Sequence, residues 1–126
     1  MKKSFAEIAK EYHLKLIVLF GSRAGKIHRK ESDADIAIVT TKPITLKKEL
    51  LLRKDLFYAL GHEIDLVILP SREATPLLLG QIAKEAQCLY GKRSDFITFK
   101  VNSMQRFIDF KPYFELQAKT IKKALA

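Results

Sequence analysis

The sequence contains 126 residues, of which 48% are hydrophobic and 29% are charged, and its formal net charge is +9 at pH 7. This length predicts one domain with a hydrophobic core and excludes two, and the single cysteine excludes an intrachain disulfide or a cysteine zinc site. The positive charge favours polyanionic partners such as nucleotides, RNA or an acidic protein surface, although a lysine-rich surface that serves solubility explains it equally well.

The N-terminus lacks the pattern of a targeting segment. Charged residues interrupt what would be the apolar core of a signal peptide in MKKSFAEIAKEYH, and no apolar run approaches the length of a membrane span. We therefore expect a cytoplasmic protein with no membrane partner. In the same segment Ser4 and Glu7 have the spacing of a capping box, and the apolar residues after them recur at helical intervals, which predicts a short first helix.

The next stretch predicts a strand that ends at a glycine-serine pair, which is either only a turn or a phosphate-binding site. Residues 16–20 form an uninterrupted apolar run, which is typical of a strand buried on both faces. Gly21 follows and allows backbone angles closed to other residues, and Ser22 is a good helix N-cap. A helix that starts there offers free N–H groups to a phosphate, and Arg23 adds a cation that can grip phosphate through two donors.

A basic connector leads from this turn to a pair of carboxylates. Asp33 and Asp35 precede a second apolar run at residues 36–39, and in an extended chain side chains two residues apart share one face. Two carboxylates held that close repel unless a cation lies between them, and hard oxygen ligands favour magnesium. The alternative is that both are solvated loop residues or caps. The basic side chains of the connector are Lys26, His28, Arg29 and Lys30, and a lone histidine there is more often solvated than catalytic.

A third strand is predicted after an amphipathic helix. Residues 44–60 carry apolar and charged side chains at helical spacing, and Gly61 ends the helix. Residues 63–69 then form an apolar strand that contains one acid, Asp65. A buried aspartate is costly unless it is paired or bound to a metal. Asp65 therefore lies either at a strand edge that faces water or in a site with the earlier aspartate pair, and the existence of that pair favours the site.

The remainder of the chain predicts two helical segments. Thr75 and Pro76 have the pattern of an N-cap and a first helical position, and they predict a helix through about Leu89 that holds Cys88 as a small buried residue. Residues 94–125 predict a last segment, which Pro112 kinks or divides. This arm is rich in aromatic residues, so it either packs back on the sheet or offers an apolar surface to another subunit, in a homo- or hetero-oligomer.

The glycine–serine turn and the aspartate pair also form a combined signature. Gly21-Ser22, ten further residues and then Asp33-Ala34-Asp35 match the GSx10DxD pattern, with apolar strands on both outer sides. In this respect the chain resembles the minimal nucleotidyltransferases, which are small members of the DNA polymerase β superfamily. The segment EIDLVIL also resembles the later strand that carries the third acidic residue of that superfamily.

The resemblance implies an α+β fold in which helices pack on a small mixed β-sheet. Residues 1–93 would form the nucleotidyltransferase core, and residues 94–126 would form a C-terminal helical arm of the same domain. The site residues that the resemblance implies are Asp33, Asp35 and Asp65 as catalytic residues and ligands of Mg²⁺, with two ions expected, and Gly21, Ser22 and Arg23 as the residues that bind the nucleotide.

The resemblance further implies an activity. Members of the family transfer a nucleoside monophosphate from a triphosphate to a hydroxyl, and those of this size are known as antitoxins that attach AMP from ATP to a tyrosine of a HEPN ribonuclease toxin. We expect this activity, with ATP as substrate and a HEPN toxin as partner. Two alternatives remain open: transfer to a small hydroxylated molecule or an RNA end, and a non-catalytic antitoxin that acts by binding. Binding of RNA by the basic surface is a further possibility.

Overall fold

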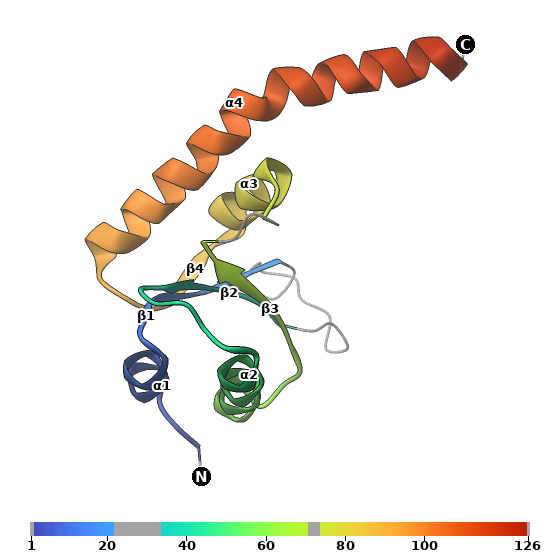
Figure 1. Ribbon diagram of the computed structural model, residues 1–126. Coiled ribbons are helices and arrows are strands. Elements are labelled where there is room, and N and C mark those ends of the chain that lie inside the picture. Colours follow the sequence, from blue (N-terminus) through green and yellow to red (C-terminus); the bar gives the residue numbers. More distant parts are fainter. Residues whose placement is uncertain (1, 22–33, 71–73, 126) are drawn as a thin grey trace.

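The chain folds into four strands and four helices in a computed structural model that describes residues 2–21, 34–70 and 74–125 (Figure 1). The elements in chain order are α1 (Phe5–Tyr12), β1 (Leu14–Phe20), β2 (Ala34–Thr40), α2 (Leu46–Leu60), β3 (Ile64–Leu69), α3 (Pro76–Glu85), β4 (Gln87–Tyr90) and α4 (Arg93–Leu125).

The strands form one mixed sheet in the order β3-β2-β1-β4. β1 pairs with β2 and with β4 in antiparallel fashion, whereas β2 and β3 are parallel. Parallel neighbours need a crossover because the chain must return to the same end of the sheet, and α2 provides that crossover. The predicted α+β fold with a small mixed sheet is therefore confirmed.

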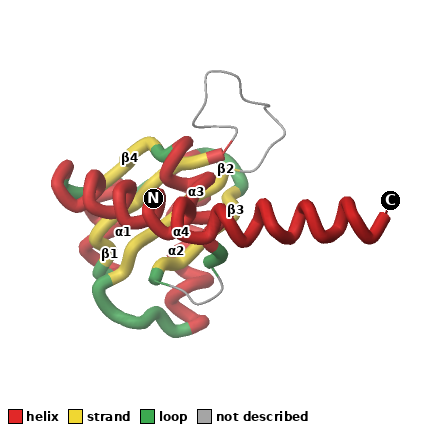
Figure 2. The backbone as a smooth tube through the Cα atoms, turned by 90° about the horizontal axis from the view of Figure 1, so that it is seen from above, coloured by secondary structure: helices red, strands yellow, loops and turns green. Residues whose placement is uncertain are grey.

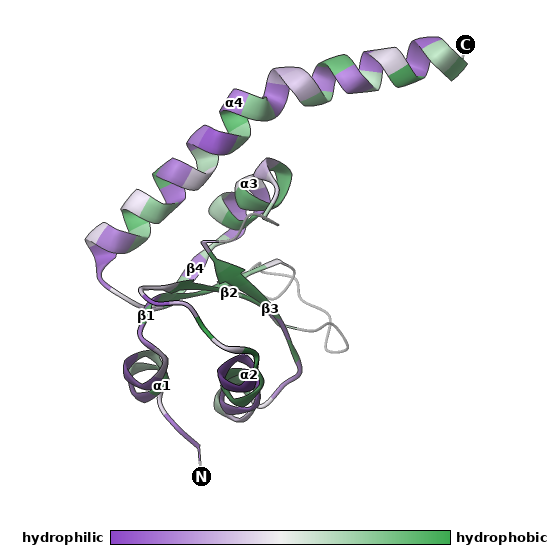
Figure 3. Cartoon of the chain, in the orientation of Figure 1, coloured by the Kyte–Doolittle hydropathy of each residue, from purple (hydrophilic) through white to green (hydrophobic). Residues whose placement is uncertain are grey.

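Helices cover both faces of the sheet. α1 and α2 lie on one face, while α3 and the first part of α4 lie on the other (Figure 1). The side chains of β1 and β2 alternate between two apolar clusters, and Figure 3 shows the hydrophobic residues concentrated in these central strands. The cluster under α1 and α2 includes Ile8, Ile17, Ile36, Ile38, Leu52 and Leu56, and the cluster under α3 and α4 includes Leu16, Val18, Phe20, Ala37, Leu79 and Ile82.

The predicted helix ends are largely confirmed. The Ser4 side chain accepts a hydrogen bond from the Glu7 backbone N–H at 3.1 Å, and the Glu7 carboxylate reaches back to the Ser4 N–H, which completes the capping box of α1. Thr75 caps α3, with Pro76 inside the first turn. Gly61 ends α2 in the left-handed conformation with φ of 68°.

One predicted element is wrong. The helix that starts at Pro76 ends at Glu85, and residues 87–90 form the edge strand β4 rather than a continuation of the helix. Cys88 is therefore a half-buried strand residue, whose thiol donates to the Tyr90 carbonyl at 3.4 Å. The strand pairs with β1 from Ile17 to Leu19, so hydrogen bonds to the sheet replace the helical bonds that the apolar pattern had suggested.

The C-terminal arm is one helix, α4, and Pro112 does not divide it. Figure 1 shows the ribbon of α4 changing direction partway along, in keeping with the hydrogen bond that a proline cannot make. The first part packs on α3 and the sheet, and the second part extends away from them (Figures 1 and 2). The exposed apolar residues of this second part include Ile108, Phe110, Tyr113, Leu116, Ile121 and Leu125. Among the described residues, no helix has the combined length and apolarity that crossing a bilayer would require.

A polar contact joins α1 to α2 beside the apolar cluster. The buried Tyr12 hydroxyl donates to Asp55 Oδ2 at 2.7 Å, and Lys3 Nζ approaches the same oxygen at 3.2 Å. Burial and then the hydrogen bond to Asp55 raise the pKa of the Tyr12 phenol above its ordinary value of 10.0. The folded chain therefore keeps this phenol protonated at pH values where the unfolded chain loses the proton.

This contact makes a prediction for Tyr12→Phe. At neutral pH the variant should lose about 1–2 kcal/mol of unfolding free energy, because it loses a hydrogen bond to a charged acceptor. Above pH 10 the unfolded parent releases the Tyr12 proton while the folded parent retains it, so the parent loses stability that the variant does not lose. Urea unfolding between pH 7 and pH 11 should show the difference in unfolding free energy between the parent and Tyr12→Phe becoming smaller as pH rises. A difference that stays constant would contradict the hydrogen bond of the protonated phenol to Asp55.

Candidate active site

The site begins where β1 ends. Phe20 is the last residue of β1 and pairs with Asp35 across the antiparallel ladder, so the chain leaves the sheet directly beside that aspartate. Gly21 follows with φ of 77°, a left-handed conformation that favours glycine. A Cβ at Gly21 would collide with the Asp35 carboxylate. Glycine is thus required here for the backbone conformation and also for the space that the Asp35 side chain occupies.

Two carboxylates lie side by side at the starts of β2 and β3. Asp35 and Asp65 are partners in the parallel register, and neighbouring strands lie about 4.8 Å apart. Along β2 the residues two and four positions after Asp35, Ala37 and Val39, pack into the cluster under α3 and α4, which places Asp35 on that face of the sheet. The same alternation along β3, where Val67 and Leu69 belong to that cluster, places Asp65 on the same face.

The two aspartates differ in burial. The Asp35 residue is half-buried against Gly21, whereas Asp65 is exposed at the edge strand of the sheet. Adjacent carboxylates repel each other unless a cation is shared between them. The oxygen donors of the pair suit a hard divalent ion such as Mg²⁺, and the exposed position of Asp65 leaves room for water and phosphate oxygens as further ligands.

The sequence-predicted site is brought together in part. Gly21, Asp35 and Asp65, which come from three different segments, meet at one end of the sheet. No cluster of three or more metal-ligating acids, histidines or cysteines occurs within residues 2–21, 34–70 and 74–125. The predicted third ligand and the other predicted nucleotide contacts lie outside the described residues, as do the basic side chains of the connector: Asp33, Ser22, Arg23, Lys26, His28, Arg29 and Lys30.

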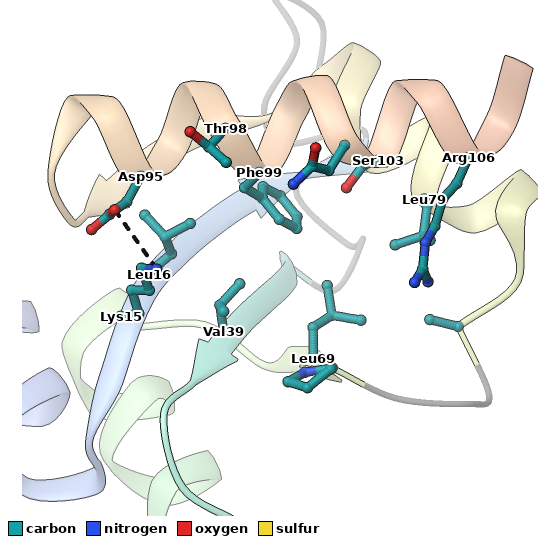
Figure 4. Close-up of a pocket in the computed structure, with 13 residues that line it drawn as sticks. Lys15, Leu16, Val39, Leu69, Leu79, Asp95, Thr98, Phe99, Ser103 and Arg106 are labelled. Carbon is teal, nitrogen blue, oxygen red and sulfur yellow. Dashed lines mark ion pairs between the residues drawn. The ribbon is translucent and has the colours of Figure 1, made fainter.

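A cavity on the same face of the sheet had no counterpart in the sequence predictions. It has a volume of about 730 Å³ and lies between the sheet and α4, at the opposite strand ends from Asp35 and Asp65 (Figure 4). Lys15 pairs with Asp95 across it at 3.7 Å, and Arg106 points into it from α4. Its lining comes from five elements, so no local pattern along the chain could have identified it.

The carboxylate pair predicts metal binding that depends on Asp35. In Asp35→Asn the affinity for Mn²⁺, a paramagnetic substitute for Mg²⁺, should fall at least tenfold, because one of the charged oxygen ligands is lost. Without metal the variant should melt at or above the temperature of the parent, since the like-charge repulsion is relieved. Electron paramagnetic resonance titration and thermal melts test both halves.

The matched control is Asp109→Asn, which removes an exposed aspartate of α4 that contacts Gln105. It should leave Mn²⁺ affinity unchanged. Equal affinities for the two variants would exclude Asp35 as a ligand, and a melting temperature of Asp35→Asn well below that of the parent would make Asp35 a structural residue.

Comparison with known proteins extends these observations. A family model described as polymerase beta, nucleotidyltransferase matches residues 3–95. Protein adenylyltransferase MntA of Shewanella oneidensis is 31% identical over 94 residues, an alignment that spans 75% of this chain and 66% of that protein, just under two thirds of its length.

Solved structures are similar over nearly the whole chain. A chain of a toxin–antitoxin structure with AMP-PNP superposes with a TM-score of 0.66 at 28% identity, covering 96% of this chain and 95% of that one. A structure is described as the tri-AMPylated Shewanella oneidensis HEPN toxin in complex with MNT antitoxin. One of its chains superposes with a TM-score of 0.60 at 27% identity, covering 96% of this chain and 92% of that one. With its carboxylates paired on adjacent strands and a family match over residues 3–95, the chain belongs to the polymerase β nucleotidyltransferase family.

Proposed function

We propose that this protein is a Mg²⁺-dependent adenylyltransferase that moves AMP from ATP to a tyrosine hydroxyl of a partner HEPN toxin, and so acts as the antitoxin of that toxin. The similar MntA is described as a protein adenylyltransferase, and the similar solved structures are described with AMP-PNP and with a tri-AMPylated HEPN toxin. The reaction consumes ATP, so we assign it to the cytoplasm.

The observation that carries the proposal is the pairing of Asp35 with Asp65 on one face, with Gly21 packed against the first of them. In our assignment Asp33, Asp35 and Asp65 would hold two Mg²⁺ ions. Bound magnesium would neutralise the triphosphate and stabilise the attacking and leaving oxygens of an in-line displacement. The turn that begins at Gly21 would hold the phosphates, through backbone N–H groups and through the Ser22 and Arg23 side chains.

The transfer is an in-line displacement at the α-phosphorus of ATP. The tyrosine oxygen attacks the α-phosphorus of ATP, a new O–P bond forms, and the bond to the β-phosphate bridging oxygen breaks to release pyrophosphate. The phenolic proton leaves to the Asp65 carboxylate and then to water, a role that its exposed position permits. Asp35, half-buried against Gly21, would instead hold magnesium at the phosphates, so the two acids have different roles.

A folded protein is the acceptor that this architecture suits best. The described cavity lies at the opposite strand ends from the acidic site, so the acceptor itself has to supply most of its own positioning at the carboxylates. The second part of α4 offers exposed aliphatic and aromatic side chains for contact, and a net charge of +9 would speed encounter with an acidic partner.

The close contact at Gly21 predicts the effect of Gly21→Ala. The added methyl group would collide with the Asp35 carboxylate and displace it, so transfer should fall at least a hundredfold. Gly61→Ala is the matched control, because Gly61 has nearly the same backbone conformation but nothing within 4 Å of an added Cβ. Both variants should lose about 1 kcal/mol or more of stability from the left-handed conformation, and only Gly21→Ala should lose transfer. Equal transfer rates for Gly21→Ala and Gly61→Ala, measured at equal folded fractions, would refute the role of this contact in transfer.

The acceptor is tested by incubating the protein with Mg²⁺, ATP labelled in the α-phosphate and three classes of acceptor: a HEPN protein from a neighbouring reading frame, total tRNA, and a panel of aminoglycosides. We expect label on a tyrosine of the HEPN protein and none with Asp35→Asn. Label on RNA or on a small molecule alone would retain the transferase chemistry and exclude the antitoxin assignment. If Asp35→Asn still neutralised the toxin, the protein would act by binding rather than by catalysis.

A further inference from the structure

The cavity under α4 is separate from the acidic site. Val39 and Leu69, which line it, lie four positions beyond Asp35 and Asp65 in the parallel register of β2 and β3. At about 3.3 Å per residue, the cavity floor is about 13 Å from the carboxylates along the strands. A ligand in the cavity therefore makes no demand on the residues assigned to transfer. We propose that this cavity binds a monocarboxylate with an aliphatic chain, such as a medium-chain fatty acid.

The walls of the cavity are chiefly apolar. Leu16, Val39 and Leu69 form the floor on the sheet, and Leu79 and Phe99 close it from the two helices (Figure 4). Phe99 is the one aromatic ring of the described lining, and the uncharged polar residues Thr98, Asn102 and Ser103 lie on α4. A flexible hydrocarbon chain fits the aliphatic part of this surface better than a flat polar ring does. The volume of about 730 Å³ is within the range of sites that hold small organic ligands.

The charges around the cavity select an anion. Lys15 Nζ lies 3.7 Å from Asp95 Oδ1, so these two lining residues largely compensate each other at one end. Arg106 points into the cavity from the other end of the lined part of α4, and within the described residues it forms no ion pair with a carboxylate (Figure 4). The described charged lining thus sums to one positive charge. A guanidinium presents parallel N–H donors that match one carboxylate.

The separation of the charged groups sets the shape of the ligand. Asp95 and Arg106 are eleven residues apart on α4, which corresponds to about 16 Å along the helix axis at 1.5 Å per residue. An elongated ligand can place its carboxylate on Arg106 and extend its chain over the apolar floor toward the Lys15–Asp95 pair. Arg106 is exposed as a residue, so the ligand can enter from solvent at that end.

The test uses decanoate as the probe, below its micellar concentration and without nucleotide, so that its result is independent of transfer. Isothermal titration calorimetry should find binding to the parent, and Arg106→Gln should weaken it about tenfold, the usual loss for one charged hydrogen-bonded contact. Decanol, which has the same chain and no charge, should bind the parent more weakly than decanoate does. Its affinity for Arg106→Gln should equal its affinity for the parent. In methyl NMR spectra, decanoate should shift the resonances of Val39, Leu69 and Leu79.

The control variant is Arg93→Gln, which removes an exposed arginine at the start of the same helix and outside the cavity lining. It changes the net charge by the same amount and should leave decanoate affinity unchanged. Loss of affinity in both variants would mean a general attraction to a basic protein and would overturn the proposal. Absence of binding at millimolar decanoate would overturn it as well, and so would binding of decanol to the parent with the same affinity as decanoate.

Discussion

The parallel pairing of β2 with β3 is the constraint on which the site depends. Side chains alternate between faces along a strand, so a slip of one residue in either strand would turn its aspartate toward α1 and α2. There it would enter the cluster that holds Ile36 and Ile38, where an ionised carboxylate is far more costly. The apolar pattern of both strands therefore specifies the register, and the register in turn brings Asp35 beside Asp65.

The close packing beside the Asp35 carboxylate explains why position 21 requires glycine. Gly21 has no side chain, and the space that a Cβ would take is filled by the Asp35 carboxylate. This arrangement keeps one carboxylate half-buried while the exposed one on β3 remains open to solvent. Two carboxylates on adjacent strands repel each other unless a cation lies between them, and such arrangements are common at sites whose geometry serves chemistry rather than stability.

Much of the fold could be predicted from local signals. The capping box marks the start of α1, because the Ser4 side chain accepts a hydrogen bond from a free N–H of the first turn. Gly61 marks the end of α2, because glycine readily adopts the left-handed conformation found there. The strand β4 could not be predicted this way, because four residues are too few to display an alternating pattern and Cys88 with Leu89 also fits the apolar period of α3. Its conformation is decided by pairing with the edge of β1.

Local signals also predicted only part of the acidic site, of the last helix and of the cavity. The spacing of Asp33 and Asp35 indicated a site, and the cost of a buried aspartate in an apolar strand favoured joining Asp65 to it. The resemblance agreed, but the register that makes Asp65 the partner of Asp35 is not local information and required the fold. Pro112 was expected to kink or divide the last helix; it does not divide it, because Ile108, whose carbonyl loses a donor, is exposed and can use water instead. The cavity under α4 depends on five elements at once, so it required the fold.

The path of α4 has a mechanical consequence. The helix contains 33 residues, or about 50 Å at 1.5 Å per residue, and only its first part is held by α3 and the sheet. A Cβ at Gly80 of α3 would overlap the ring of Phe107, so the two helices meet there with no space to spare. A small rotation of α4 about that contact therefore displaces the far end of the helix by a larger distance. A protein bound at the far end would in turn act on the packing of α3 against α4.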